Sequence, residues 1–441
     1  MNRSRTLITS YYWPPSGGPG VQRILKFVKY LPEYGVDPSV LTVANPTYPL
    51  RDPTLLEEVP PGIQVYKTRT LEPFALYAGL KGGKADDITP ATEIQGDTLT
   101  STVGSWVRAN LLIPDARAGW VVTATRRALK LVEDQNIDTI LTSGPPHSVH
   151  FIGKWVSQRT GIRWIADFRD PWSQVYYNQL LPRTQMAEQI DESLERRILQ
   201  EASEVIVVSD RQAEHFRKHC ERGYRVIPNG FDPADFPDPR PTPDPPKEGR
   251  YCMRHIGTVG EAAIPHSLLR LLAKTPELPV DLEFMGDLHN DLQKEVTALE
   301  LGERVTLSGY RPHREAVDAM CRSQLLLLIL PAVPEMEHHI PGKLFEYLGT
   351  GRPILMLGPP EGESARRIRN AGGQVVAPDD TDGLLAALQS LITQLSVHPD
   401  APDISHPDLH PSSRTELSRQ LAQLIHQTEA GTPPQELEDS A

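Results

Sequence analysis

Short apolar runs alternate along the chain with segments in which apolar residues recur at helical spacing. The first apolar run lies at 5–10, and after a loop Val21, Ile24 and Val28 repeat at the spacing of one helix face. Strands that alternate with amphipathic helices in this way are typical of parallel sheets with helices on both faces. The pattern therefore predicts an α/β protein.

The pattern predicts two series of such elements. In the first series strands are expected at 5–10, 38–43, 137–142, 163–166 and 205–208. The helices of that series are expected at 117–135, 147–160, 184–201 and 210–219. In the second series strands are expected at 253–258, 281–285, 305–307, 325–330, 353–357 and 374–376. Its helices are expected at 264–274, 288–301, 313–322, 342–349, 362–371 and 381–395, followed by an amphipathic helix at 412–428. Residues 45–105 show no pattern that assigns them.

The two series are separated by a segment rich in proline. Residues 228–249 read PNGFDPADFPDPRPTPDPPKEG, which cannot form a helix or a central strand. We interpret this segment as an interdomain linker. The predicted domains are 1–232 and 251–396, with linkers at 233–250 and at the start of 397–430, and a disordered acidic tail at 431–441. In doubly wound sheets ligands bind beyond the carboxyl ends of the strands, so the site is expected in a cleft between the domains.

Composition narrows the class of protein. The 441 residues carry a net charge of −12, which argues against a broad basic surface for nucleic acid. The longest apolar run, Leu325 to Leu330, ends at Pro331 and is far shorter than the ~20 residues that cross a bilayer. The N-terminus has no apolar core of a signal peptide, and three scattered cysteines fit a reducing compartment. We expect a cytoplasmic protein, and peripheral contact with the inner face of a membrane stays open.

The first motif that carries chemistry is SGGPG, residues 16–20, between the first strand and its helix. Glycines without side chains let backbone N–H groups approach a phosphate or a sugar at a helix N-terminus. The spacing matches neither a dinucleotide-binding loop nor an NTPase loop. The alternative is a tight turn with no ligand.

The second motif is IPGKLFEYLGTGRPI, residues 340–354. Gly342 begins a predicted helix, Lys343 lies in its first turn, and Glu346 follows on the same face. A helix N-terminus with a lysine suits a diphosphate, and a carboxylate one turn later can accept hydrogen bonds from ribose hydroxyls. The alternative is a surface ion pair between Lys343 and Glu346.

Other clusters favour structural roles. His215, His219 and Cys220 lack the glutamate of a zinc-protease motif. Asp380 and Asp382 resemble a metal-binding Asp-x-Asp, but their place before a helix favours capping. We therefore expect no essential metal. The cations Arg23, Lys26 and Lys29 share one helix and, with Trp13, could touch anionic lipid, although such a face is usually solvated.

Seven segments in order resemble the family-4 retaining glycosyltransferases of GT-B fold, in particular the bacterial branch that assembles surface polysaccharides and glycoconjugates. They are YYWPPSGGPGVQRILKFVKYLPEYG, TSGPPHSVHF, RWIADFRDPW, VIPNGFD, HIGTV, VTLSGY and IPGKLFEYLGTGRPIL. The resemblance covers residues 5 to about 430. It implies two Rossmann-like domains facing across a cleft, a nucleotide-sugar bound mainly by the C-terminal one, an acceptor on the N-terminal one, and a C-terminal helix that crosses back to the N-terminal domain.

The resemblance also implies roles for individual residues. Gly17 and Gly18 match the glycines near the donor phosphate, and Glu346 matches the second of two family glutamates, which contacts the ribose. The first family glutamate falls at His338, with Glu335 and Glu337 out of register. The arginine and lysine that clamp the diphosphate in many members are missing after HIGTV, and Lys343 and Arg311 are expected to replace them. Leu344 completes the donor-binding set that we predict.

The acceptor side is expected at the ends of two strands in the N-terminal series. The resemblance implies that His147 matches a histidine that related enzymes place near the anomeric carbon of the transferred sugar. It is the predicted catalytic residue, and the alternative is that it caps the next helix. His150 shares that role or packs. Asp170 contacts the acceptor, or belongs to an Asp–Arg brace with Asp167 and Arg169.

The resemblance, together with the motifs, implies a metal-independent retaining glycosyltransferase, without a cofactor, that moves a sugar from a nucleotide-sugar to a hydroxyl of a glycan, a lipid-linked molecule or a small molecule. Two alternatives remain: a sugar-nucleotide epimerase of the same fold, and a non-catalytic subunit that binds sugar nucleotides. The sugar, the nucleotide base, the acceptor, the oligomeric state and the effect of His338 are not determined by the sequence.

Overall fold

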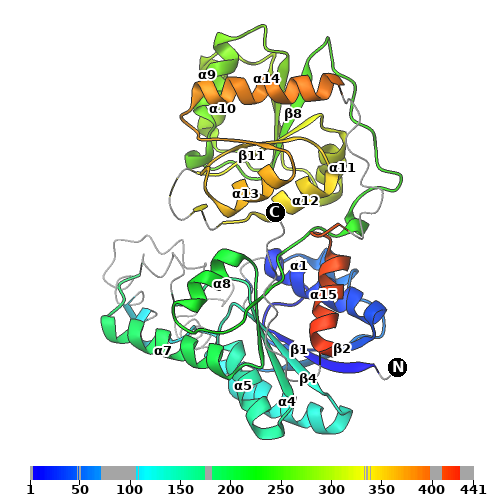
Figure 1. Ribbon diagram of the computed structural model, residues 1–441, viewed down its shortest axis with the longest axis vertical. Helices are drawn as coiled ribbons and strands as arrows, with labels where there is room; N and C mark the ends of the chain where they lie inside the picture. The colour runs from blue at the N-terminus through cyan, green and yellow to red at the C-terminus, as the bar shows by residue number, and fades with distance from the viewer. Residues whose placement is uncertain are drawn as a thin grey trace, which may run out of the picture. The chain divides into compact units, whose positions relative to one another are not determined.

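The computed structural model describes residues 3–46, 48, 51–70, 106–107, 109–173, 181–331, 333, 336–337, 339–397 and 410–427. The chain divides into two compact units (Figure 1). The N-terminal unit comprises Met1–Pro228 together with Leu417–Ala441, and the C-terminal unit comprises Asn229–Glu416. The predicted tail at 431–441 lies outside the described residues, as does His338.

The N-terminal unit is built on a parallel sheet in the order β3-β2-β1-β4-β5-β6-β7. Its strands are β1 (Ser4–Ser10), β2 (Val36–Val43), β3 (Gln64–Thr68), β4 (Thr139–Gly144), β5 (Arg163–Phe168), β6 (Glu204–Val207) and β7 (Arg225–Val226). The central strands β1 and β4 are paired in register from Thr6 and Thr139 to Ser10 and Ser143. Their apolar side chains project from both faces of the sheet, so a layer of helices is needed on each side to bury them.

Helices cover the two faces of this sheet separately. They are α1 (Pro19–Tyr30), α4 (Val121–Gln135), α5 (Val149–Thr160), α7 (Gln185–Glu201), α8 (Asp210–Arg217) and α15 (Arg414–His426), with 3₁₀ turns at Leu31–Tyr34, Pro53–Leu56 and Ala118–Trp120. Apolar side chains of α4, α5, α7 and α8 form one core, and those of α1 and α15 form a second core on the opposite face. In Figure 1 the red helix α15 lies beside the dark blue helix α1.

The C-terminal helix is held on the N-terminal unit by packing and by one arginine. Leu417 and Leu421 of α15 are fully buried in the core that α1 shares. The guanidinium of Arg163 on β5 donates to the carbonyls of Leu424 and Gln427, at 2.5 and 2.7 Å. These carbonyls end a helix and have no intrahelical donor, so the arginine satisfies them.

The C-terminal unit repeats the architecture with a parallel sheet in the order β10-β9-β8-β11-β12-β13. Its strands are β8 (Tyr251–Ile256), β9 (Val280–Met285), β10 (Val305–Gly309), β11 (Leu325–Ile329), β12 (Ile354–Leu357) and β13 (Gln374–Val376). Its helices are α9 (His266–Lys274), α10 (Asn290–Ala298), α11 (His313–Arg322), α12 (Gly342–Thr350), α13 (Glu363–Asn370) and α14 (Thr381–Val397), with 3₁₀ turns at Pro233–Asp235 and Glu261–Ala263. One face is covered by α9, α10 and α14, and the other by α11, α12 and α13.

The prediction of two doubly wound parallel sheets is confirmed, and each predicted strand begins and ends within two residues of an observed one. Two strands were not predicted. β3 lies in the unassigned region and β7 has only two residues, and both are edge strands with partly exposed side chains. An edge strand carries a weaker apolar signal because only one neighbour and one face bury it.

The proline-rich segment is packed against the C-terminal unit. Phe231 and Phe236 join Phe345 of α12 in a small apolar cluster. Further along, the Asp244 amide donates to the carbonyl of Arg322 at 2.9 Å. The segment expected to be a linker at 233–250 therefore contributes side chains to the core of one unit.

The expectation of a solvated cationic face on α1 is wrong. Arg23 is fully buried and Lys26 is 2% exposed, and Trp13 is 2% exposed as well. Arg23 forms an ion pair with Asp167 at 2.8 Å, and Lys26 forms one with Glu58 at 2.5 Å. These cations are buried because each has a carboxylate partner from another element, which the pattern along α1 does not reveal.

Among the described helices, none is long and apolar enough to cross a membrane.

Candidate active site

Each sheet reverses its strand order at one point, between β1 and β4 and between β8 and β11. At such a point the connections leave in opposite directions and open a crevice at the carboxyl ends of the strands. The glycine motif follows β1, His147 follows β4, the HIGTV segment ends β8, and α12 follows β11. Both sequence motifs therefore lie at the edges where ligands bind in this class of sheet.

Helix α12 is fixed against the end of β8 by a buried tyrosine. The Tyr347 hydroxyl accepts a hydrogen bond from the Ile256 amide at 2.9 Å, and the ring is fully buried. Burial raises the pKa of Tyr347, so its hydroxyl stays neutral. Gly342 is exposed at the first position of the helix, where the N–H groups have no intrahelical partner. The start of α12 is thus a solvent-accessible helix N-terminus.

Lys343 extends from this helix to β8. Its ammonium lies 3.0 Å from Nε2 of His255, whose Nδ1 lies 3.0 Å from the carbonyl of Leu327 on β11. Burial lowers the pKa of Lys343 to about 8, and the negative charge of Glu346 partly opposes this shift. The pKa of this lysine lies close to neutral pH, and its side chain is partly shielded from water. An anionic ligand would therefore strongly stabilise its charged form.

Two glycines let the loops beside Lys343 approach closely. Gly257 has φ 125°, and a Cβ there would lie 2.9 Å from the Lys343 ammonium. Gly286 has φ 150°, and a Cβ there would lie 2.2 Å from the carbonyl oxygen of Gly257. Any other residue at Gly286 would collide with the backbone, so the β8 and β9 loops require glycine to meet.

Glu346 lies one turn after Lys343 but has a different partner. Its Oε1 lies 2.9 Å from Nε2 of His313, the first residue of α11. The alternative of an ion pair between Lys343 and Glu346 is therefore wrong, since the lysine contacts His255 instead. Glu346 is partly exposed and can reach a ligand at the same edge of the sheet.

The other predicted donor residues differ in how they are placed. Arg311 is exposed after β10, and its nearest carboxylate is that of Glu315 at 3.9 Å. Leu344 is fully buried, and its amide donates to the Pro341 carbonyl at 3.0 Å. The structure thus uses Leu344 for packing, whereas Arg311 is available at the rim.

In the N-terminal unit, Gly17 and Gly18 precede α1. Gly18 is the N-cap residue with φ 98°, a conformation that favours glycine. A buried arginine supports this turn: Arg169 donates to the carbonyls of Gly20 and Gly144, at 2.5 and 3.0 Å. A Cβ at Gly20 would lie 2.3 Å from Arg169. The guanidinium thereby ties the first turn of α1 to the end of β4.

His147 lies in a stack of rings behind this turn. Its ring is parallel to that of Trp172, with centroids 5.2 Å apart, and the side chain is 6% exposed. Burial, with a smaller effect of the Arg169 charge, lowers the pKa of His147 to about 3. The capping alternative is wrong, because the N-cap of α5 is Ser148, whose amide donates to Asp115 at 2.8 Å. Both ring nitrogens of the neutral His147 are shielded from solvent in this structure.

The two remaining acceptor-side candidates differ in burial. His150 is fully buried, with Nδ1 2.9 Å from the Thr142 hydroxyl and its ring 4.3 Å from that of Phe168. Asp170 is exposed, and its charge raises the pKa of the neighbouring Arg169 against the stronger effect of burial. Asp170 is therefore accessible to an acceptor, whereas His150 packs against the β4–β5 edge.

Sequence reasoning missed three residues of this region. His255, His313 and Asp115 lie near the carboxyl edges of the two sheets, and each contacts a residue that the motifs single out or the loop that carries it. His255 is the histidine of the HIGTV segment, for which the sequence predicts no separate role. No local signal marks these residues, because each finds its partner across the fold.

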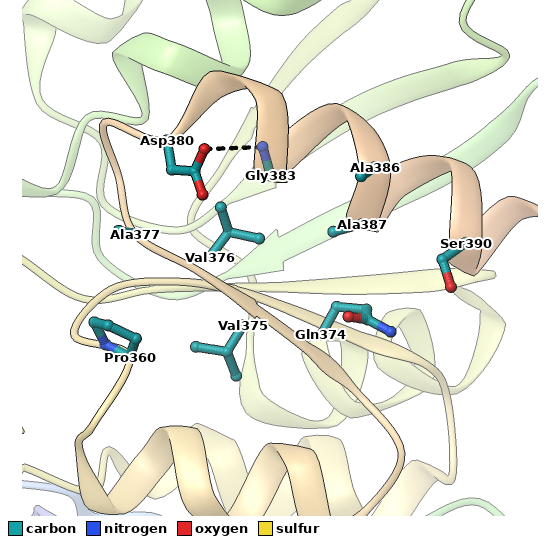
Figure 2. A pocket seen from close by; sticks show the side chains of 10 residues that line it. All are labelled: Pro360, Gln374, Val375, Val376, Ala377, Asp380, Gly383, Ala386, Ala387 and Ser390. Atoms are coloured by element: carbon teal, nitrogen blue, oxygen red, sulfur yellow. Dashed lines mark hydrogen bonds between the residues drawn. The ribbon is translucent and has the colours of Figure 1, made fainter.

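A groove lies elsewhere in the C-terminal unit (Figure 2). It is lined by the edge strand β13 and by α14, including Val376, Ala387 and Ser390, and none of the predicted donor residues lines it. At its end Asp380 accepts a hydrogen bond from the Gly383 amide at 2.9 Å, which confirms the capping role.

In the N-terminal unit, α8 ends at Arg217 and His219 lies beyond it. The predicted extension of that helix to 219 is therefore wrong.

Comparisons with known proteins agree with this architecture. Residues 17–230 match the family model of the glycosyl transferase 4-like domain. A glycosyltransferase from Rickettsia africae superposes with a TM-score of 0.63 at 13% identity, over 96% of this chain and 98% of that one. The chain has the GT-B fold. No curated protein sequence gives a significant match to it.

Two further structures show how widely this fold is used. HepE from Anabaena, solved in complex with UDP, has a TM-score of 0.53 at 15% identity and covers 96% of this chain and 95% of its own. A putative UDP-N-acetylglucosamine 2-epimerase from Listeria monocytogenes has a TM-score of 0.53 at 11% identity, with 96% of each chain covered. At these identities the likeness establishes the GT-B fold only. The reaction has to be inferred from the residues of the site.

Proposed function

We propose that this protein is a retaining glycosyltransferase that transfers a sugar from a nucleotide-sugar to a hydroxyl acceptor in polysaccharide or glycoconjugate synthesis. The observation that carries the proposal is the accessible N-terminus of α12, where Lys343 is directed by neighbours on β8 to the carboxyl edge of the sheet. A helix N-terminus and a lysine together bind a diphosphate. HepE, which has the same fold, was solved with UDP.

In this proposal the C-terminal unit holds the donor. The diphosphate docks on the first amides of α12, beginning at Gly342, and Lys343 and Arg311 neutralise its charge. Glu346 accepts hydrogen bonds from the ribose hydroxyls, releasing the contact with His313. Gly257 and Gly286 keep side chains out of the space between the β8 and β9 loops and Lys343.

The N-terminal unit would supply the acceptor side. Gly17 and Gly18 present backbone amides before α1, and His147 donates or accepts a hydrogen bond as a neutral imidazole. The nucleoside diphosphate departs and leaves an oxocarbenium-like sugar, which the leaving phosphate stabilises. The acceptor hydroxyl attacks from the same face and passes its proton to that phosphate, so the anomeric configuration is retained. Neither a metal nor a separate cofactor takes part.

The setting proposed for this reaction is the cytoplasm. Cys220, Cys252 and Cys321 are all free thiols, as expected for a chain that stays in a reducing compartment. A lipid-linked acceptor would bring the protein to the inner face of the membrane. The burial of Arg23 and Lys26 removes the cationic helix face as a site for anionic lipid, so contact would involve other residues.

A sugar-nucleotide epimerase is the second candidate, because the putative epimerase from Listeria monocytogenes shares the fold. The two reactions differ in their need for an acceptor. Incubation with radiolabelled nucleotide-sugars separates them: a transferase moves label to an acceptor, and an epimerase turns the donor over without one. Binding without turnover would instead support a non-catalytic subunit.

The donor site is tested by thermal stabilisation with UDP and GDP. We expect one of these nucleotides to raise the Tm of the wild type, and Lys343→Ala and Glu346→Ala to lose most of that shift. Lys274→Ala is the matched control, since Lys274 is an exposed lysine on α9 of the same unit. If both site variants keep the wild-type shift, the donor does not bind at α12.

A further inference from the structure

We propose that His255 is a positioning residue that aims the ammonium group of Lys343 at the donor diphosphate. The inference rests on the proposed donor site and adds to it a residue that contacts neither sugar nor nucleotide. Its basis is a chain of contacts from β11 through β8 to α12, in which Leu327, His255 and Lys343 are joined in series.

The contacts of His255 with Leu327 and Lys343 favour the same arrangement of its ring protons. Nδ1 lies 3.0 Å from the Leu327 carbonyl, which can only accept, so Nδ1 carries the hydrogen. Nε2 lies 3.0 Å from the Lys343 ammonium, which can only donate, so Nε2 is the acceptor. Both neighbours therefore select the same neutral tautomer. The side chain is 1% exposed, so water does not compete for either contact.

The environment of His255 keeps its ring neutral at neutral pH. Burial, followed by the positive charge of Lys343, lowers the pKa of His255 to about 3, while backbone groups at Leu327 and Thr258 oppose the shift. A protonated ring would repel the lysine, and this pKa excludes that state at neutral pH. The neutral ring can therefore accept a hydrogen bond from Lys343.

The rest of the crevice leaves Lys343 few other positions. Gly257 packs along the lysine side chain, where an added Cβ would lie 3.5 Å from both Cδ and Cε. The helix itself is fixed by Tyr347 on the Ile256 amide. An ammonium group has three N–H donors, and the hydrogen bond to His255 uses one of them. Two remain for phosphate oxygens at the start of α12.

The test compares two substitutions, each of which keeps one of the two hydrogen bonds of His255: the one to Lys343 or the one to Leu327. In His255→Gln, the side-chain amide reaches the position of Nε2 and can still accept from Lys343. In His255→Asn, the shorter amide can still donate to Leu327 but cannot reach the lysine. Binding of UDP and GDP is measured by titration calorimetry for both variants, for Lys343→Ala, and for each His255 variant combined with Lys343→Ala.

We expect His255→Asn to weaken nucleotide binding by about tenfold, the size of one lost hydrogen bond to a charged group, and His255→Gln to stay within about threefold of the wild type. In the Lys343→Ala background, His255→Asn should change affinity by less than about twofold, because the residue acts only through the lysine. An equal loss with and without Lys343, or an equal loss for Gln and Asn, would overturn the proposal.

The same measurements distinguish this inference from the donor site itself. If the wild type binds neither nucleotide, or if Lys343→Ala binds as well as the wild type, both the donor site and the role of His255 are wrong. If Lys343→Ala loses affinity and the His255 variants cause a further loss of the same size with or without Lys343, only the inference on His255 fails. Should the His255→Asn variant fail to fold, His255→Gln decides the matter: a folded Gln variant that binds as weakly as Lys343→Ala contradicts the proposal.

Discussion

Arg23 on α1 and Asp167 on β5 form a fully buried ion pair with two parallel hydrogen bonds. Arg23 donates from Nε and from a terminal nitrogen to the two carboxylate oxygens, at 3.1 and 2.8 Å. The same guanidinium also donates to the carbonyl of Ile227 at 2.9 Å. Asp167 in turn accepts from the Ser143 hydroxyl at 2.7 Å. This network joins the start of α1 to β4 and β5 beneath the proposed acceptor side.

Removing one charge of this pair should destabilise the protein strongly. Asp167→Asn leaves the Arg23 guanidinium buried without a counter-charge, and we expect a loss of about 3 to 5 kcal/mol in the free energy of unfolding. The double variant Arg23→Met with Asp167→Leu should lose less than either single change, because no unpaired charge remains. Urea unfolding measures both. A double variant less stable than both singles would contradict this account.

Nucleotide binding should depend on the protonation of Lys343. Its pKa is lowered to about 8 by burial, so the free lysine is charged below pH 8 and neutral above it. The facing groups are His255, which stays neutral, and Glu346, which favours the charged lysine. A bound diphosphate raises the pKa again, so affinity should fall about tenfold between pH 7 and pH 9 while binding takes up a proton.

Calorimetry in buffers of different ionisation enthalpy measures that proton uptake. Lys343→Arg serves as the control, because the guanidinium stays charged throughout this range and its binding should be flat with pH. Equal affinity of the wild type at pH 7 and pH 9 would show that the lysine charge is not used.

A methyl group at Gly257 should disturb the lysine. In Gly257→Ala the new Cβ lies 2.9 Å from the Lys343 ammonium, and φ 125° is strained for alanine. We expect a fall in nucleotide affinity of about tenfold and a loss of roughly 1 to 3 kcal/mol in stability. Gly260→Ala, in the same loop, meets nothing within 4 Å and should behave as the wild type in both assays.

Glu195 on α7 should make the N-terminal unit less stable as pH rises. Burial raises the pKa of Glu195 to about 7, and the nearby charge of Asp191 adds to this, against hydrogen bonds from Ser173 and Trp172. The folded state therefore keeps a proton that the unfolded state releases near pH 4.5, so stability is full below pH 4.5 and is lost as pH rises through 7.

The substitution Glu195→Gln tests this directly, since the amide has the shape of the neutral acid. Relative to the wild type, the variant should gain about 3.5 kcal/mol as pH rises from well below 4.5 to well above 7, since the pKa differs by 2.5 units at about 1.4 kcal/mol each. Unfolding curves recorded at several pH values would refute the prediction if the difference between the two proteins did not change.

The C-terminal helix should be required for the stability of the N-terminal unit. Leu421 is fully buried in the core shared with α1, so Leu421→Ala should cost about 2 to 5 kcal/mol. Gln423→Ala lies on the exposed side of the same helix and should change stability by less than about 0.5 kcal/mol. Equal unfolding midpoints for the two variants would mean that α15 is not part of this core.

Much of this structure follows from local sequence. Apolar periodicity placed the buried strands, such as β11, and the helix that starts at Gly342, because a fully buried strand and a helix N-terminus each leave a signal within a few residues. The same periodicity missed β3 and β7, whose pairing partners, rather than their own side chains, make them strands.

What the sequence alone determined was the class of fold and the two motifs at the carboxyl edges of the sheets. Only the tertiary structure decided the partners of the charged residues. Lys343 contacts His255 instead of Glu346, and Arg23 is paired with Asp167 instead of facing solvent. The physical reason is distance along the chain. Helical spacing reports neighbours one turn apart, whereas these pairs join residues far apart in sequence that meet only when parallel strands align at their carboxyl ends.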